Sequence, residues 1–172
     1  MTSVPGPAAH RASTRLCYRV EYQIRSARIT DISRLSALGW DAISEPGRGA
    51  LDAADLLRQL VNLPNASVLI AESRRELAGS ALLVLRPSVT AGGYIGTIDF
   101  ILVADSHDAD GVTEALLDEL LRSAGNKGCS IVDVAQPTDP ESLARLERAG
   151  FSLAGPTLRR PVAAAGSVAR RI

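Results

Sequence analysis

A short segment in the middle of the chain combines carboxylates, a glycine and the start of a helical pattern. Residues 105–113 read Asp-Ser-His-Asp-Ala-Asp-Gly-Val-Thr, and apolar residues recur at helical spacing over residues 112–124. The first N–H groups of a helix have no partner within the helix and carry partial positive charge, so they favour an anion such as phosphate. Gly111 lets the backbone close around that anion, and the Thr113 hydroxyl can donate to it. The segment therefore predicts a phosphate-binding turn.

Three aspartates in the same segment oppose an anion. Asp105, Asp108 and Asp110 fall where the phosphate would bind. Two like charges about 4 Å apart repel by about 1 kcal/mol in water and by about 4 kcal/mol at an effective dielectric constant of about 20. Aspartates are also common at helix starts, which they stabilise by about 0.3–1 kcal/mol. Asp108 and Asp110 are thus open to two interpretations, as weakening an anion site or as ordinary helix caps.

Asp99 is the candidate for acid–base chemistry, because it interrupts an apolar strand pattern over residues 92–104. Loss of hydration in such a strand raises the pKa of a carboxyl group, which suits a general base. The alternative is a strand-edge aspartate that faces solvent. Cys129 and Ser130 have no histidine nearby in the sequence, which argues against a nucleophilic triad. The cysteines show no metal-ligand spacing, so no metal site is predicted.

Strand and helix signals alternate around these residues. Strands are predicted over residues 18–27, 67–72, 76–86, 92–104, 130–135 and 151–160, and helices from Thr30 or Asp31 onward and over residues 52–63, 112–124 and 140–149. Antiparallel strands followed by β-α-β units predict the α/β (α+β) class, with one central mixed sheet and helices on both faces. The strands that end at Val103 and Ala135 are expected to be parallel neighbours that diverge at their ends.

Two segments carry a family resemblance. In residues 103–117 an apolar strand end, a loop with Gly111 and an apolar helix follow one another, and residues 146–151 read Leu-Glu-Arg-Ala-Gly-Phe. With the order of elements, they resemble the GNAT superfamily of acyl-CoA-dependent N-acetyltransferases. In that family the two segments read roughly V-x-P-x-Y-R-G-x-G-I-G-x-A-L-L and Y-E-K-L-G-F. The resemblance covers about residues 22–158.

This resemblance implies acetyl-CoA as cosubstrate and a primary amine, on a small molecule or a peptide, as acceptor. It implies Asp99 as the catalytic base, because some members carry a glutamate there. The residues expected to bind the donor are Leu102 and Val103, through their backbone groups, and Asp110, Gly111, Val112 and Thr113 around the pyrophosphate.

Three positions depart from the family pattern. Asp108 replaces a basic or amide residue, Ala109 replaces a glycine, and Leu146 replaces a tyrosine that protonates the leaving thiolate in many members. A leucine cannot donate that proton. Two hypotheses follow: an N-acetyltransferase, or a non-catalytic protein of the same fold that acts as a binding or regulatory module. We take the enzyme as the working hypothesis.

Composition limits the partners. The length of 172 residues suits one domain, expected at residues 18–162 between a disordered leader (1–17) and a flexible tail (163–172). Lys+Arg and Asp+Glu both number 19, which provides no excess positive charge for nucleic acid, and no apolar run approaches the about 20 residues of a membrane span. The scarcity of cysteine and the lack of a signal-peptide pattern lead us to expect a cytoplasmic protein, and the preponderance of Arg over Lys suggests a bacterial one. A homodimer is left open.

Overall fold

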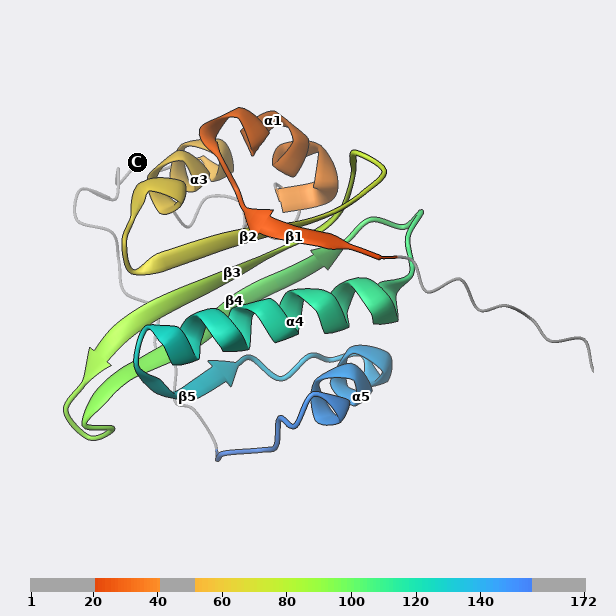
Figure 1. Ribbon diagram of the computed structural model, residues 1–172. Helices are drawn as coiled ribbons and strands as arrows, with labels where there is room; N and C mark the ends of the chain where they lie inside the picture. Colours follow the sequence, from red (N-terminus) through yellow and green to blue (C-terminus); the bar gives the residue numbers. More distant parts are fainter. Residues whose placement is uncertain (1–20, 41–51, 156–172) are drawn as a thin grey trace, which may run out of the picture.

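The computed structural model describes residues 21–40 and 52–155 (Figure 1). The expected leader, which contains Cys17, and the expected tail lie outside these residues. The segment after Trp40, whose Pro46, Gly47 and Gly49 predict a loop, also lies outside them as far as Leu51. The elements in chain order are β1 (Gln23–Ser26), η1 (Ile29–Asp31), α1 (Ile32–Leu35), η2 (Ser36–Trp40), α3 (Ala53–Asn62), β2 (Ala66–Ser73), β3 (Glu76–Ser88), β4 (Gly93–Val103), α4 (Ala109–Asn126), β5 (Cys129–Val134) and α5 (Pro140–Arg148).

One mixed sheet organises the domain. Its strand order is β1-β2-β3-β4-β5, and every neighbouring pair is antiparallel except β4 and β5, which run parallel. The connection between the two parallel strands is α4, as expected for a β-α-β unit. The predicted mixed α/β fold is confirmed.

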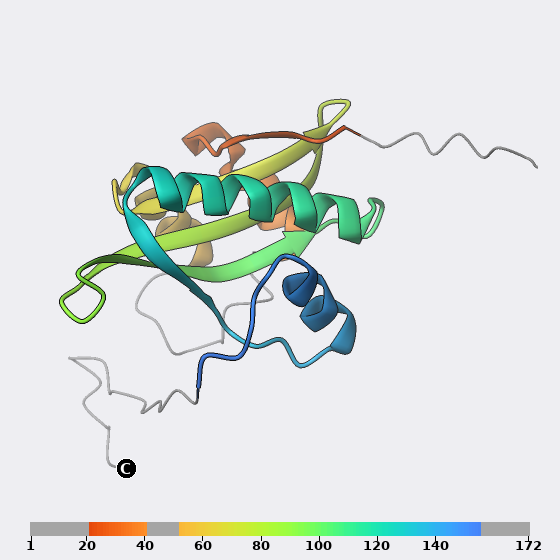
Figure 2. The same cartoon turned by 60° about the horizontal axis from the view of Figure 1, so that its bottom comes forward.

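Helices cover both faces of the sheet (Figures 1 and 2). Alternation along β2 sends Leu69 and Ala71 toward α4, and Val68 and Ile70 toward α1 and α3. On α4, four of the five apolar residues at helical spacing are buried, Val112, Leu116, Leu117 and Leu120, and the fifth, Leu121, is half-buried. Each such leucine contributes about 1.5–3 kcal/mol of hydrophobic free energy relative to an exposed one. No helix within residues 21–40 and 52–155 is long and apolar enough to cross a membrane.

Several local predictions were wrong. Leu56 on α3 is 45% exposed, although the helical pattern places it on the same side as the buried Leu57. The strand predicted over residues 130–135 corresponds to β5, whose apolar residues suggest burial, but its side chains are exposed or half-buried because it is the edge of the described sheet. Residues 151–155 form no strand, and the remainder of the strand predicted to reach residue 160 lies outside the described residues.

A network of two arginines and two acids joins β1, β2 and α1. Arg25 donates to both carboxylate oxygens of Asp31 at 2.8 and 3.0 Å and to Glu72 at 2.9 Å, and Arg34 donates to Glu72 at 2.7 Å. Asp31 is buried and also accepts the Arg28 N–H, so it closes the turn instead of capping α1 through its side chain. The hydrogen bonds from Arg25 hold the pKa of both Asp31 and Glu72 below the ordinary range.

We predict that this network makes stability depend on pH. Because the two carboxyl groups have lower pKa values in the folded chain, their contribution is complete above about pH 4.5 and is lost as the pH falls through the folded values. Asp31→Asn should lower the free energy of unfolding by about 1–3 kcal/mol near pH 7, with the loss shrinking below about pH 4. Urea titrations across pH test this, with Asp55→Asn in an exposed pair with Arg58 as the control that changes little. A loss for Asp31→Asn that is independent of pH would contradict the account.

Close packing of α4 against the sheet generates a second prediction. A Cβ added at Gly79 on β3 would lie 2.6 Å from Cγ1 of Val112 and 2.7 Å from the carbonyl oxygen of Leu102. Gly79→Ala should therefore push α4 and β4 apart and cost about 1–3 kcal/mol. Gly125→Ala is the matched control, because nothing lies near its Cβ and alanine favours a helix by up to about 1 kcal/mol. Equal melting temperatures for the two variants would refute this tight contact.

Candidate active site

Asp99 lies at a β-bulge. In the ladder between β3 and β4, Leu82 pairs with Phe100 and Leu83 pairs with Ile98, so Asp99 is the extra residue on β4. Such a bulge bends its strand and increases the local twist. Its side chain is exposed, so Asp99 matches the solvent-facing alternative.

The neighbouring strands β4 and β5 separate at this bulge. Their parallel ladder ends where Ile98 pairs with Val134, while β4 continues to Val103. No described strand covers the edge of β4 beyond Ile98, so backbone N–H and C=O groups on that edge lack a ladder partner. The predicted parallel pairing and divergence are thus present.

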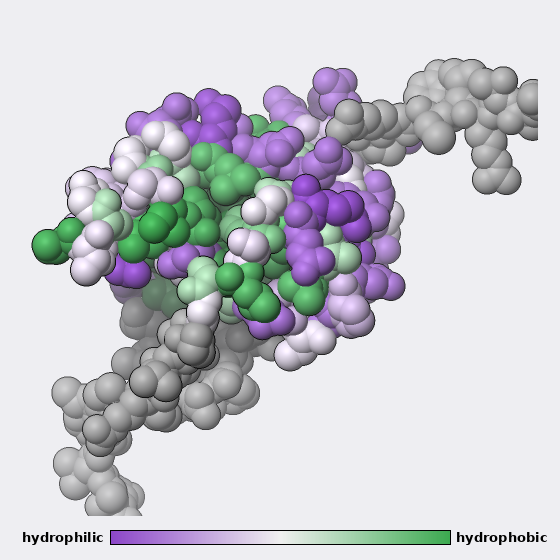
Figure 3. Space-filling view, turned by 90° about the horizontal axis from the view of Figure 1, so that it is seen from below, coloured by the Kyte–Doolittle hydropathy of each residue, from purple (hydrophilic) through white to green (hydrophobic). Residues whose placement is uncertain are grey.

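A cleft of about 370 Å³ opens where the strands separate. Apolar and polar side chains are mixed along it, as on the surface of the molecule around β5 and α5 (Figure 3). The lining comes from β4, α4, the segment after β5, and α5: Asp99, Phe100, Ile101, Val103, Ala109, Thr113, Val134, Ala135, Pro137, Asp139, Ser142, Arg145 and Leu146.

Helix α5 supplies polar side chains that the sequence had not singled out. Asp139 caps the helix by accepting the Ser142 N–H at 2.8 Å, and this hydrogen bond lowers the pKa of Asp139. Ser142 precedes Leu146 by one turn, so both face the cleft. Arg145 donates to Asp110 at 2.6 Å, and this bond lowers the pKa of Asp110 and raises that of Arg145. The cap at Asp139 and this helical spacing could have revealed both residues.

The start of α4 holds its own carboxylate. The helix begins at Ala109, so Asp108 is its N-cap and Gly111 lies within the first turn. The two carboxylate oxygens of Asp108 accept the Asp110 N–H at 3.1 Å and the Gly111 N–H at 3.2 Å, and its carbonyl accepts the Val112 N–H at 3.0 Å. Of the N–H groups expected to face a phosphate, those of Gly111, Val112 and Thr113, the first two are therefore already bound to Asp108.

Gly111 is needed for this cap. A Cβ there would lie 2.7 Å from Oδ2 of Asp108 and 3.3 Å from Cε2 of Tyr22. Tyr22, just before β1, also faces the ring of His107 at 6.3 Å between centroids. Space at residue 111 therefore serves the aspartate cap and the packing of the chain before β1.

The predicted site residues separate into groups. Asp99, Val103 and Thr113 line the cleft, whereas Asp110 lies in the adjoining groove between α4 and α5. The side chain of Leu102 packs on the other face of the sheet, and that of Val112 is in the core under α4. Among the described residues, no group of His, Cys, Asp and Glu could hold a metal ion.

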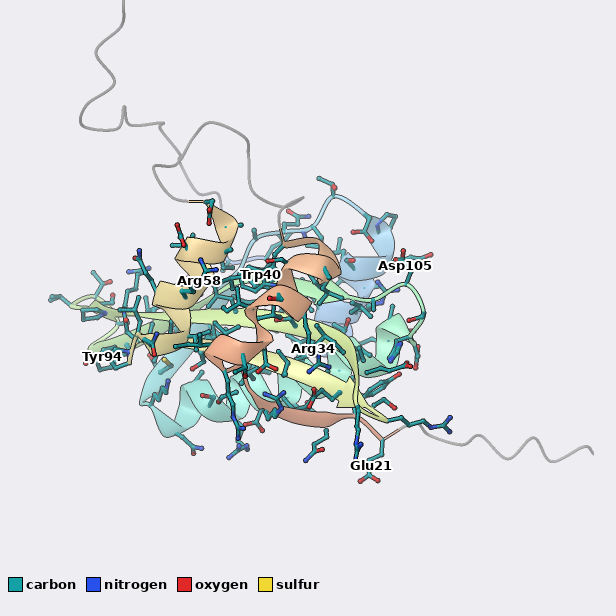
Figure 4. All side chains as sticks on the ribbon, turned by 90° about the horizontal axis from the view of Figure 1, so that it is seen from above. Glu21, Arg34, Trp40, Arg58, Tyr94 and Asp105 are labelled. Atoms are coloured by element: carbon teal, nitrogen blue, oxygen red, sulfur yellow. The ribbon has the colours of Figure 1, made fainter. Side chains whose placement is uncertain are left out.

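Three further residues, Leu146, Trp40 and Tyr94, differ in how close they lie to the cleft. Leu146 is buried at the cleft, where it adds only apolar surface. Trp40 is buried and packs edge-on against Phe100, with ring centroids 4.0 Å apart. Phe100 lines the cleft, and Trp40 does not. Tyr94 lies at the start of β4, far from Asp105 beyond the other end of that strand (Figure 4). Neither Trp40 nor Tyr94 lines the cleft, although aromatic residues of this kind can form part of an acceptor pocket.

The capped helix start predicts a measurable coupling. Gly111→Ala should displace the Asp108 carboxylate and cost about 1–2 kcal/mol, the usual value of an N-cap. In an Asp108→Ala background, the same change should cost little, since there is no carboxylate to displace. A double-mutant cycle by urea denaturation should give a coupling of at least about 1 kcal/mol. Additive costs would show that Asp108 does not occupy the turn.

Comparison with known proteins places this fold and cleft in a family. The family model described as "Acetyltransferase (GNAT) family" matches residues 34–151. No curated protein matches the chain significantly.

Solved structures agree in fold at low sequence identity. A transcriptional regulator from Bacillus halodurans C-125 aligns with a TM-score of 0.69 at 18% identity, over 81% of this chain and 99% of that one. A ribosomal-protein-alanine N-acetyltransferase from Brucella melitensis biovar Abortus 2308 gives 0.67 at 20% identity, over 83% and 100%. An aminoglycoside acetyltransferase, meta-AAC0020, from an uncultured soil metagenomic sample gives 0.62 at 16% identity, over 81% and 93%. With its mixed sheet, its diverging β4 and β5 and the match across most of its length, this chain belongs to the GNAT acetyltransferase family.

Proposed function

We propose that the protein transfers an acetyl group from acetyl-CoA to a primary amine. The observation that carries the proposal is the cleft between β4 and β5, which opens beside a strand edge without a ladder partner. Such an edge can bind an extended chain through its backbone, as in strand addition. The pantetheine arm of the donor is a chain of this kind, with two amide groups.

The residues of the cleft suit the thioester end of the donor. Leu102 pairs with Ser80 of β3 and does not line the cleft, so the backbone of Val103 is the better candidate to bind the arm. Phe100, Ile101 and Val134 supply apolar surface around it. Thr113 is buried in α4 and lines the same cleft. Holding donor and amine side by side can supply about 7–11 kcal/mol of the barrier through proximity alone.

Asp99 is the proposed general base. The bulge places it on the lining of the cleft while its side chain stays exposed, so an incoming ammonium group can reach it. Its carboxylate takes a proton from the ammonium, and the free amine then attacks the thioester carbonyl. The new C–N bond forms as the C–S bond breaks, the electron pair leaves with sulfur as a thiolate, and the nitrogen of the new amide loses its remaining extra proton to water.

Protonation of that thiolate needs no tyrosine. Thiols have pKa values of about 8.5, so the leaving group is stable enough near neutral pH to take its proton from water. Ser142 offers a hydroxyl on the same wall as Leu146. Its Oγ lies 3.4 Å from Nη1 of Arg145, whose charge favours loss of the hydroxyl proton.

An amine acceptor agrees with the comparison. Two of the similar structures are named for acetyl transfer to a ribosomal-protein alanine and to an aminoglycoside. We propose a small-molecule or peptide amine for this chain, without nucleic acid or membrane partners, in the cytoplasm of a bacterium.

A second candidate function is a non-catalytic module with the same fold. The observation that favours it is the Asp108 carboxylate bound to the N–H groups at the start of α4, together with Ala109 and Leu146 in place of family residues. Such a module would bind a partner or ligand and transfer nothing. The two candidates differ in whether a thiol is released from acetyl-CoA when an amine is present.

We predict that Asp99→Asn lowers kcat for acetyl transfer about 100-fold or more, because it removes the base. Thiol release from acetyl-CoA is measured across peptide, polyamine and amino-sugar acceptors. Asp133→Asn on β5 is the matched control, an exposed strand aspartate outside the cleft lining, and it should leave kcat unchanged. Asp99→Glu should recover part of the rate.

Two outcomes would count against parts of this account. Equal rates for Asp99→Asn and wild type would remove Asp99 from the chemistry while leaving acetyl transfer in place. Release of no thiol with any acceptor, by a folded protein that still binds a ligand, would favour the non-catalytic module.

A further inference from the structure

Two of the N–H groups at the helix start beside the cleft are already bound by a carboxylate of the chain itself. An α-helix offers an anion only the N–H groups of its first turn. Here the Asp110 and Gly111 N–H groups are bound by the Asp108 carboxylate, and the Val112 N–H by the Asp108 carbonyl. A pyrophosphate at this position would have to displace that carboxylate and abandon the cap.

The side chains around this helix start would also repel a pyrophosphate. Asp105, Asp108 and Asp110 are all exposed near it. Both arginines of α5 that reach this end of α4 are bound to the same oxygen of Asp110, at 2.6 Å for Arg145 and 3.2 Å for Arg148. Arg145 also donates to Glu141 at 3.3 Å.

The groove between α4 and α5 is also lined by both acidic and basic side chains. It encloses about 400 Å³ and shares Thr113 and Arg145 with the lining of the cleft. Three carboxylates, Asp110, Glu114 and Asp118, line it against the guanidinium groups of Arg145 and Arg148. Both arginines of this groove are already paired with Asp110, so a phosphate here would have to compete with that carboxylate.

The cleft beyond Ile98 carries none of these obstacles. It offers an open strand edge, a lining in which apolar and polar side chains are mixed, and about 370 Å³, enough for part of an extended thioester arm. The two halves of the expected donor thus meet different conditions: the pantetheine half fits the described residues, and the pyrophosphate half does not.

We infer that the protein recognises its acyl donor through the pantetheine arm and the thioester alone, so that its ligand class is acyl-pantetheine thioesters and the nucleotide adds no affinity. This inference rests on the proposed function, because it concerns the same cleft. The nucleotide of acetyl-CoA then stays in solvent, and a donor without it binds equally well.

Titration calorimetry on the full chain tests the inference with three probes: acetyl-CoA, S-acetylpantetheine, and 3′,5′-ADP, which is the nucleotide part without the arm. We expect Kd values for the two thioesters within about threefold of each other. We expect 3′,5′-ADP neither to bind nor to compete. Added salt should change neither Kd by much, since no phosphate contact is made.

Variants at residue 108 supply the second test. Asp108→Ala frees the Asp110 and Gly111 N–H groups and removes one repelling charge, so Kd for acetyl-CoA should fall at least about tenfold while Kd for S-acetylpantetheine stays constant. If Asp108→Ala lowers the melting temperature severely, Asp108→Ser replaces it, because a serine still caps the helix without the charge. Asp133→Asn, which removes a carboxylate away from this helix start, should leave both Kd values unchanged.

The outcomes separate this inference from the proposed function. If acetyl-CoA binds at least tenfold more tightly than S-acetylpantetheine and 3′,5′-ADP competes with it, the inference is overturned while acetyl transfer survives. If neither thioester binds to folded protein, both the inference and the proposed function fail. Equal thioester affinities, together with the selective gain on removing Asp108, would establish the inference.

Discussion

The site depends on one constraint: β4 continues for five residues beyond the point where its pairing with β5 ends. The extra residue Asp99 bends β4, the ladder with β5 stops at Ile98, and β4 runs on to Val103 without a described partner on that side. The walls of the cleft are fixed by other contacts. Helix α4 cannot move toward the sheet, because Val112 already fills the space beside Gly79. Helix α5 is tied to α4 by the ion pairs of Asp110 with Arg145 and Arg148. A single bulge thus places a carboxylate and an open strand edge in one cavity.

The start of α4 shows how one residue can serve stability and change recognition. The Asp108 carboxylate satisfies two N–H groups that would otherwise need water or a ligand, and Gly111 leaves room for it. The same bonds remove the positive end of the helix from the surface available to a phosphate. Membership of the family fixes the fold and the position of the cleft, but the chemistry depends on the side chains that line it. The donor arm and the donor nucleotide therefore have to be considered separately in this chain.

Much of the fold was predictable because periodic apolar residues report which face of an element is buried. The leucines of α4 and the alternation along β2 gave the layers, and the order of elements gave the parallel pair β4 and β5. Burial of β5 was mispredicted because an edge strand and a central strand can carry similar apolar residues. In the site, Asp99 could be recognised as a polar residue in an apolar strand. Its place at a bulge could not be predicted, because a bulge depends on the register between β3 and β4. The hydrogen bonds of Asp108 and the contacts of Arg145 with Asp110 depend on geometry in three dimensions, so the sequence showed the acids without showing their partners.

Amide chemical shifts provide the most direct test of the central claim that the donor enters between β4 and β5 and leaves the helix start untouched. A titration of isotopically labelled protein with acetyl-CoA would report each backbone N–H separately. The account predicts shifts at Ile101, Val103 and Ala135 along the cleft, with the Asp110 and Gly111 amides unchanged because Asp108 already holds them. Large shifts at Asp110 and Gly111, or no shift along β4, would contradict it.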